Sequence, residues 1–168
     1  KDRLPVFRTE RMKQLLCSAI DDARHSAGFL LFAYVIMIDH LHLLTNRPST
    51  TSDLLRVLKS LTARRVIDYL KEHRFADSLA KLQHSAREGN YKYSLWQVEK
   101  NVLPIFSEAM FMQKVNYIHQ NPVRAGLVER PLDYRWSSFR MWNGCQQMDE
   151  PLLVDNDLIH WRRSVRRR

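Results

Sequence analysis

The chain has 168 residues, which is enough for one compact domain with a substantial core but not for two domains of ordinary size. Its 27 Lys and Arg residues against 18 Asp and Glu residues give a formal net charge of +9, which favours a polyanionic partner, nucleic acid first, over an acidic small molecule. Two cysteines without a CxxC neighbour argue against a disulfide framework, and no apolar run predicts a membrane span or a signal peptide, so we expect a soluble, cytoplasmic protein.

The N-terminal half predicts one helix followed by two adjoining strands. Apolar side chains recur with the spacing of one helical face over Glu10–Ala27, and Gly28 offers a stop for that helix. The apolar and aromatic run Phe29–Met37 predicts a strand that is buried on both faces. The run His40–Thr45 predicts its neighbour, after a turn at Asp39.

The rest of the chain predicts two further helices. Pro48–Ser52 is expected to form a loop that ends in helix-capping residues, and the apolar spacing over Leu54–Leu70 predicts a helix with a basic outer face. Ser107 can cap the next helix, which we expect to end near Asn121 because the proline at position 122 disfavours helix before it.

The order of these segments predicts an α+β fold. Helices and strands alternate without the regular spacing of βαβ units and without a Gly-rich phosphate loop, which favours a mostly antiparallel sheet with helices packed on one face. Between the two later helices we expect a turn at Gly89–Asn90 and a short strand near Tyr93–Val98.

Two histidines one residue apart in a predicted strand are the first candidate site. Alternate residues of a strand share a face, so His40, His42 and Leu44 are expected to point the same way and the two imidazoles to converge. Two such rings can chelate a metal ion, but two ligands do not make a site, and a structural role for the pair stays open. Neither the HxHxDH continuation nor an HExxH motif occurs.

The second candidate is the stretch around Tyr117 and Asn121, which lie four residues apart on one helical face. They could supply a phenol nucleophile and an amide oxygen ligand. The alternative is that Tyr117 packs at the rim of the helix while Asn121 closes the helix before Pro122.

Basic residues supply candidate contacts to a nucleic-acid backbone. An ordinary solvated helix face explains any one of them as well, and Trp136 and Phe139 beside two of the arginines could stack on bases or belong to the core. The stretch 161–168, "WRRSVRRR", predicts a basic arm. The candidate backbone contacts are Arg56, Lys59, Arg64, Arg65, Lys71, Arg124, Arg135 and Arg140.

Four stretches in order, "MIDHLHLL", "SLWQ", "YIHQNPVRAGLV" and "YRWSSF", resemble the REP-associated tyrosine transposases, which are IS200-like members of the HUH single-strand nuclease superfamily. The resemblance covers most of the chain. It implies a ferredoxin-like α/β sandwich with a mainly antiparallel sheet, in which His40, His42 and Asn121 bind a metal ion and Tyr117 is the nucleophile.

The resemblance also implies a reaction. The protein would be a sequence-specific endonuclease and transposase that cleaves and rejoins single-stranded or hairpin DNA at repetitive extragenic palindromes, through a 5′-phosphotyrosine intermediate. Two imidazoles and an amide oxygen suit Mg²⁺ or Mn²⁺ in such a phosphoryl-transfer site. The alternative function is a binding domain derived from such an enzyme, which holds single-stranded or hairpin nucleic acid without cutting it.

The chain departs from the family's pattern in two places. Ile38 stands where proline commonly precedes the Asp-His pair, and relatives usually carry a strand just before a segment like "RLPVF", almost where this chain starts. We therefore expect a sheet without its first strand, either because the sequence is shortened at its start or because the sheet is completed in another way, such as by a partner chain. We expect residues 1–128 to form the catalytic domain, residues 129–168 to form a C-terminal extension, and the protein to act as a monomer or homodimer near the bacterial nucleoid.

Overall fold

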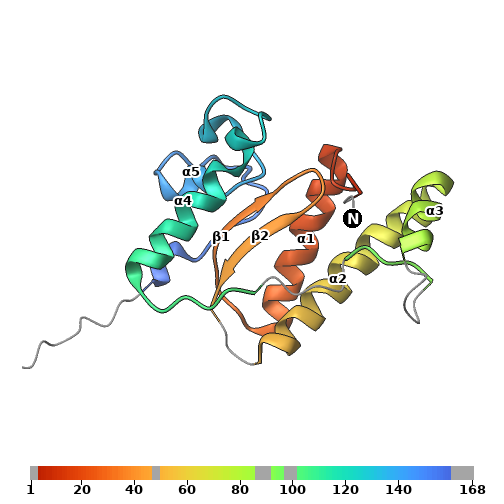
Figure 1. The fold of residues 1–168 in the computed structure, drawn as a ribbon, viewed down its shortest axis with the longest axis horizontal. Helices are drawn as coiled ribbons and strands as arrows, with labels where there is room; N and C mark the ends of the chain where they lie inside the picture. The colour runs from red at the N-terminus through yellow and green to blue at the C-terminus, as the bar shows by residue number, and fades with distance from the viewer. Residues whose placement is uncertain (1–3, 47–49, 86–91, 97–101, 160–168) are drawn as a thin grey trace, which may run out of the picture.

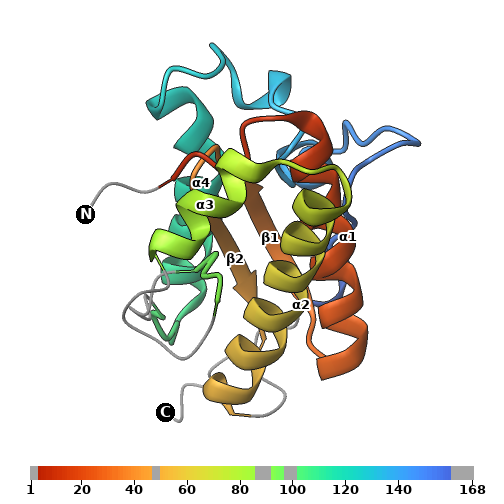
Figure 2. The same cartoon turned by 90° about the vertical axis from the view of Figure 1, so that its right-hand side faces the viewer.

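A hairpin of two strands lies between two layers of helices in the computed structural model, which describes residues 4–46, 50–85, 92–96 and 102–159 (Figure 1). The α+β class is confirmed. The helices cover both sides of the hairpin rather than one, because α4 lies on the side opposite α1 and α2 (Figure 2). The elements are α1 (Glu10–Ala27), β1 (Leu31–Ile36), β2 (Leu41–Thr45), α2 (Thr51–Glu72), α3 (Ala76–Ser85), α4 (Glu108–Arg124) and α5 (Phe139–Trp142), with 3₁₀ turns at Pro131–Asp133 and Asn156–Leu158.

Helix α1 has the predicted bounds because both of its ends are capped. The Thr9 hydroxyl accepts a hydrogen bond from the Met12 amide at 3.3 Å, and Gly28 takes a left-handed φ of 65° after the last turn. Leu16, Ile20 and their neighbours on the same face are fully buried, as the apolar spacing predicts. Within the described ranges, no helix is long and apolar enough to cross a bilayer.

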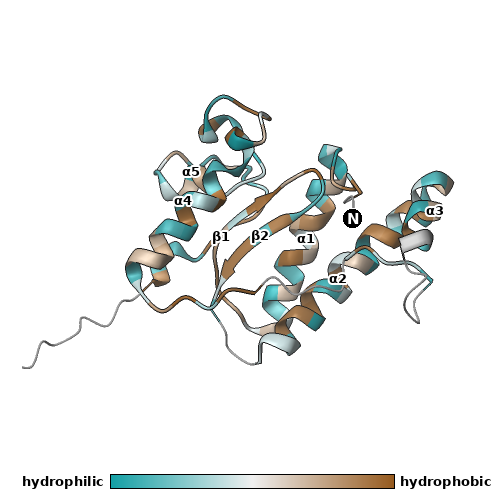
Figure 3. Cartoon of the chain, in the orientation of Figure 1, coloured by the Kyte–Doolittle hydropathy of each residue, from teal (hydrophilic) through white to brown (hydrophobic). Residues whose placement is uncertain are grey.

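Strands β1 and β2 pair antiparallel and form the centre of the core. The Met37 amide donates to the His40 carbonyl at 2.8 Å, which closes the turn at Ile38 and Asp39 and sets His42 opposite Val35. β1 is buried on both faces as predicted, apart from the half-buried Phe32, and the hairpin is largely hydrophobic in Figure 3. Both strands are shorter than their predicted runs.

The edge of β1 that faces away from β2 is bonded by the C-terminal part of the same chain. Three backbone hydrogen bonds do this: Ile36 N to Trp136 O at 2.9 Å, Ser138 N to Tyr34 O at 3.0 Å, and Asp155 N to Leu31 O at 2.7 Å. This edge is therefore closed to strand addition by a partner chain. Trp136 is 6% exposed, so it belongs to the core rather than to a stacking surface. Residues 4–9, which precede α1, contain no strand.

Helix α2 begins at Thr51, inside the predicted loop, because the Thr50 hydroxyl accepts a hydrogen bond from the Asp53 amide at 3.1 Å. Arg74 then breaks the helix with a φ of 56°, and α3 follows, which the sequence did not predict. Among the described side chains of α3, Leu79 and Leu82 alone pack in or against the core, so the apolar period of this helix is short. Residues 92–96 contain no strand, and the rest of the predicted strand and the Gly89–Asn90 turn lie outside the described residues.

Helix α4 corrects the predicted stop at Asn121, because it continues through Pro122 to Arg124. A proline in the last turn removes one backbone donor, and the Asn121 side-chain amide lies 3.5 Å from the Ile118 carbonyl that this donor would have served. The helix ends where Gly126, at a φ of 68°, donates to Val123 O and the next amide donates to Pro122 O, each at 2.9 Å. This Schellman motif, not the proline, sets the end of the helix.

A buried hydrogen-bond network ties α4 to β1. Nε2 of His119 lies 2.9 Å from the Ser138 hydroxyl, which also accepts from the Tyr34 amide at 3.0 Å. His119 is 3% exposed, and burial lowers its pKa from the ordinary 6.5 to about 4. The imidazole is therefore neutral at physiological pH.

The buried His119 predicts a pH dependence of stability. Between about pH 6.5 and pH 4 the unfolded chain binds a proton at this position that the folded chain does not, so stability is complete above pH 6.5 and falls as the pH drops through this window. The loss amounts to up to about 3 kcal/mol. In urea unfolding followed by circular dichroism across this window, His119→Gln should show a much flatter decline than the wild type.

The matched control is His25→Gln, which removes an exposed histidine from α1 and should keep the decline of the wild type. If His119→Gln declines as steeply as the wild type, His119 is not the group that couples folding to pH.

Candidate active site

The imidazoles of His40 and His42 converge at the start of β2. Their ring centroids lie 5.1 Å apart with an interplanar angle of 85°, and both rings are partly exposed. The two-residue period of the strand brings them to the same face, as the sequence predicts. At this separation both rings can reach one ion, because metal–nitrogen bonds are about 2.0–2.1 Å long.

Asp39 orients the first of these rings. Its Oδ1 lies 2.6 Å from Nδ1 of His40, a contact that suits the tautomer with its proton on Nδ1 and leaves the lone pair of Nε2 available to a ligand. Metal-binding histidines commonly donate their second ring nitrogen to a carboxylate in this way. Sequence reasoning assigned Asp39 only to the turn, although a carboxylate directly before a candidate ligand was the signal for this role.

Tyr117 faces the histidines from α4. Its ring centroid lies 5.6 Å from that of His42, and its side chain is 40% exposed. His119, two residues further on, points into the core to Ser138 and does not take part. The structure thus brings together Tyr117 and His42 from two elements that are 75 residues apart in the sequence.

Asn121 lies one turn after Tyr117, and its amide is held by the helix backbone. Nδ2 donates to the Tyr117 carbonyl at 2.7 Å, which turns Oδ1 away from that carbonyl. In the described ranges, no group of three His, Cys, Asp or Glu residues could hold a metal ion, so a metal site on the two histidines would need a further donor of another residue type. An amide oxygen meets that need, and the donor set of two imidazoles and Asn121 fits a divalent cation.

Two cations lie against the ring of Tyr117. Nζ of Lys114 is 5.6 Å from the ring centroid and Cζ of Arg124 is 5.3 Å from it. Neither side chain pairs with a carboxylate of the described residues. Sequence reasoning included Arg124 among its basic residues but missed Lys114, whose three-residue spacing from Tyr117 was the available signal.

The other basic residues singled out from the sequence are not gathered at this site. Five of them are on α2, across the hairpin from α4 (Figure 1), and Lys59 among these is half-buried. The stretch 161–168 lies outside the described residues. Most of the candidate basic residues have partners within the protein. The partners are Asp53 for Arg56, Asp68 for Arg64, Asp22 and Ser18 for Arg65, the Tyr93 ring for Lys71, Asp149 for Arg135, and the Leu132 carbonyl and Gln147 for Arg140.

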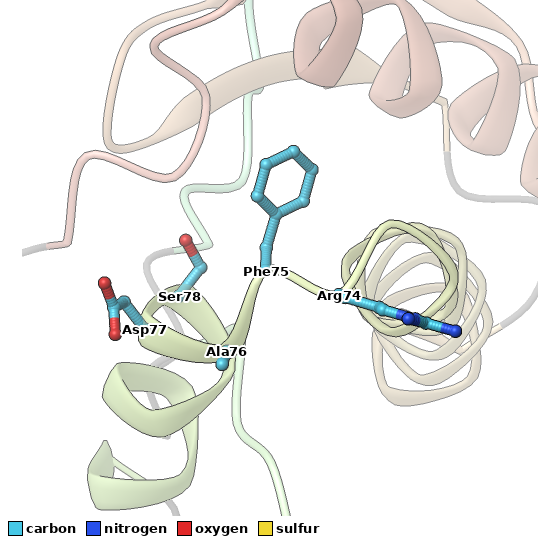
Figure 4. A pocket seen from close by; sticks show the side chains of 5 residues that line it. All are labelled: Arg74, Phe75, Ala76, Asp77 and Ser78. Carbon is cyan, nitrogen blue, oxygen red and sulfur yellow. The ribbon is translucent and has the colours of Figure 1, made fainter.

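A hollow of about 320 Å³ lies elsewhere, at the elbow between α2 and α3 (Figure 4). Arg74 and Asp77 point to opposite sides of the elbow, and the ring of Phe75 rises between them. The residues that line this hollow, Arg74 to Ser78, include none of the predicted site residues. The candidate active site is therefore the cluster on β2 and α4.

Comparisons with known proteins agree with this fold and identify a family. A solved structure described as a REP-associated tyrosine transposase bound to a REP hairpin has a similar fold, with a TM-score of 0.56 and 20% sequence identity over 89% of this chain and 87% of that chain. No curated protein sequence matches significantly. The family model described as "Transposase IS200 like" matches residues 1–121. The chain therefore belongs to the family of IS200-like transposases.

Proposed function

We propose that the protein is a metal-dependent single-strand DNA endonuclease and transposase that cleaves and rejoins DNA through a covalent bond to Tyr117. The observation that carries this proposal is the placement of Tyr117 beside His42, whose ring lies against that of His40. Asp39 contacts His40, and Asn121 follows Tyr117 by one helical turn. Membership of a transposase family supports it. The hairpin bound by the structural neighbour supports hairpin DNA at repetitive extragenic palindromes as the substrate.

Nε2 of His40, the ring of His42 and Oδ1 of Asn121 would hold a Mg²⁺ or Mn²⁺ ion. When bound, such an ion would polarise the scissile phosphate and offset the charge that develops on it. Asp39 lies against Nδ1 of His40, and the Tyr117 carbonyl accepts from Nδ2 of Asn121. These contacts would orient the two donors before an ion binds.

Tyr117 supplies the nucleophile. Its oxygen forms a bond to phosphorus while the bond from phosphorus to the 3′-oxygen breaks, the phenol proton is lost, and the 3′-oxygen leaves as a hydroxyl. A phosphodiester replaces a phosphodiester, so the 3′-hydroxyl of a second strand can reverse the step and join DNA. The half-exposed position of Tyr117 leaves room for the strand to reach it.

The remaining assignments complete the proposal. Residues 1–128 form the catalytic domain and residues 129–168 an extension that packs on it through Trp136 and Ser138. The enzyme works on bacterial DNA as a monomer or homodimer. A binding domain without catalysis is the alternative, and the same assay distinguishes it.

The covalent intermediate is the first expected outcome. When the protein is mixed with Mn²⁺ and a labelled single-stranded hairpin, label should migrate with the protein on a denaturing gel. Tyr117→Phe should abolish this adduct and leave hairpin binding nearly unchanged, because the ring and its neighbours stay while the nucleophilic oxygen is lost. Tyr69→Phe, which removes the hydroxyl of a partly exposed tyrosine on α2, is the matched control and should form the adduct normally.

An adduct in Tyr117→Phe as abundant as in the wild type rules out Tyr117 as the nucleophile. If the wild type binds the hairpin but gives neither cleavage nor an adduct with any divalent ion tested, the protein is a binding domain without catalysis.

The role of Asp39 gives a second expected outcome. Asp39→Asn should weaken Mn²⁺ binding about 10-fold to 100-fold, since the carboxylate that orients His40 is lost while both imidazoles remain. Calorimetric titration of the DNA-free protein with Mn²⁺ measures this directly. The control variant Asp68→Asn removes an equally charged residue from α2 and should bind Mn²⁺ as tightly as the wild type does. If Asp39→Asn binds Mn²⁺ with unchanged affinity, Asp39 does not orient His40 for a metal ion.

A further inference from the structure

We propose that Lys114 and Arg124 hold the scissile phosphate against Tyr117. This inference rests on the proposed function, because it names the groups that bring the phosphodiester to the same site. The two side chains would bind the phosphate oxygens that lie away from the metal ligands, and in the absence of DNA they rest on the Tyr117 ring.

The geometry of α4 directs both cations to one place. Lys114 lies one turn before Tyr117 and Arg124 two turns after it, so both share the face of the helix that carries the phenol. Long side chains on a helix lean toward its N-terminus, which carries Arg124 back over the ring. The ring is consequently contacted from both directions along the helix, at 5.6 Å and 5.3 Å.

The charge balance at this point favours an anion. Arg56, Arg64, Arg65 and Arg135 all lie near carboxylates, which already compensate much of their charge. Lys114 and Arg124 have no carboxylate within ion-pair distance among the described residues. These two cations on one face of α4 form a positive surface where a phosphodiester offsets charge without breaking an ion pair.

The chemistry of the two groups suits the reaction. The planar guanidinium of Arg124 can donate two parallel hydrogen bonds to two phosphate oxygens, and Lys114 adds a mobile point charge. Their charge reduces the repulsion between the phosphate oxygens and the electron-rich oxygen of Tyr117 as it approaches phosphorus. Both residues would act on the substrate, as phosphate ligands rather than as acids or bases.

The chain offers matched controls for both substitutions. Arg11 lies 5.5 Å from the ring of Tyr69, and Lys92 lies 5.6 Å from the ring of Tyr93, so each repeats a cation–ring contact away from the candidate site. Arg11→Gln and Lys92→Gln therefore remove the same charge and the same kind of contact as Arg124→Gln and Lys114→Gln.

The first measurement is binding without chemistry. In a Tyr117→Phe background with EDTA, the affinity for a fluorescent single-stranded oligonucleotide is followed by anisotropy at increasing salt. Arg124→Gln and Lys114→Gln should each lower the slope of log affinity against log salt by about 0.7, the value for one lost phosphate contact on a single strand. The control variants should keep the slope, and equal slopes in all four variants overturn the proposal.

The second measurement is the rate of adduct formation at saturating hairpin DNA in otherwise wild-type protein. Arg124→Gln should slow it on the order of 100-fold, and Arg124→Lys should restore part of the rate. An unchanged rate in Arg124→Gln overturns the proposal even where Tyr117 carries the adduct. Conversely, lowered salt slopes together with no adduct in the wild type support the phosphate-holding pair and refute the proposed transposase chemistry.

Discussion

The docking of α4 against β1 is the constraint on which the site depends, because Tyr117 and the histidines belong to separate elements. The His119–Ser138–Tyr34 network fixes this docking inside the core, where an unsatisfied partner would leave a buried polar group that costs about 1–3 kcal/mol. The apolar residues Phe111, Val115 and Ile118 add the packing on the same face of α4. Ser138 comes from the segment that covers the outer edge of β1. The C-terminal part of the chain thus helps to position the nucleophile without touching it.

The sequence predicted those elements whose signals are local. α1 has six apolar residues on one face, a threonine cap and a glycine stop, so both of its ends were predictable. The sequence also predicted that His40 and His42 point to the same side, because alternate residues of a strand share a face. Tyr117, Asn121 and the metal could be linked to them only through the resemblance to a family, because spacing along the chain does not show that α4 lies against β2.

The features that the sequence did not predict depend on contacts between distant residues or on weak local signals. α3 has two apolar anchors, too few for a clear period. The sequence placed the end of α4 at Asn121 because Pro122 was taken as the stop signal. The helix ends instead at Arg124, where Gly126, two residues further on, forms the Schellman motif. Arg65 and Arg135 resemble free cations in the sequence, but their acidic partners lie 43 and 14 residues away. Net charge therefore indicates a polyanionic partner without locating where it binds.

The central claim is that Tyr117 becomes covalently bonded to DNA. Mass spectrometry of the protein after reaction with hairpin DNA and Mn²⁺, followed by nuclease trimming and proteolysis, tests it most directly. The account predicts a nucleotide bonded through its 5′-phosphate to the peptide that contains Tyr117, with fragmentation placing the modification on the tyrosine. A modification on any other residue, or cleaved DNA with every tyrosine peptide unmodified, would contradict it.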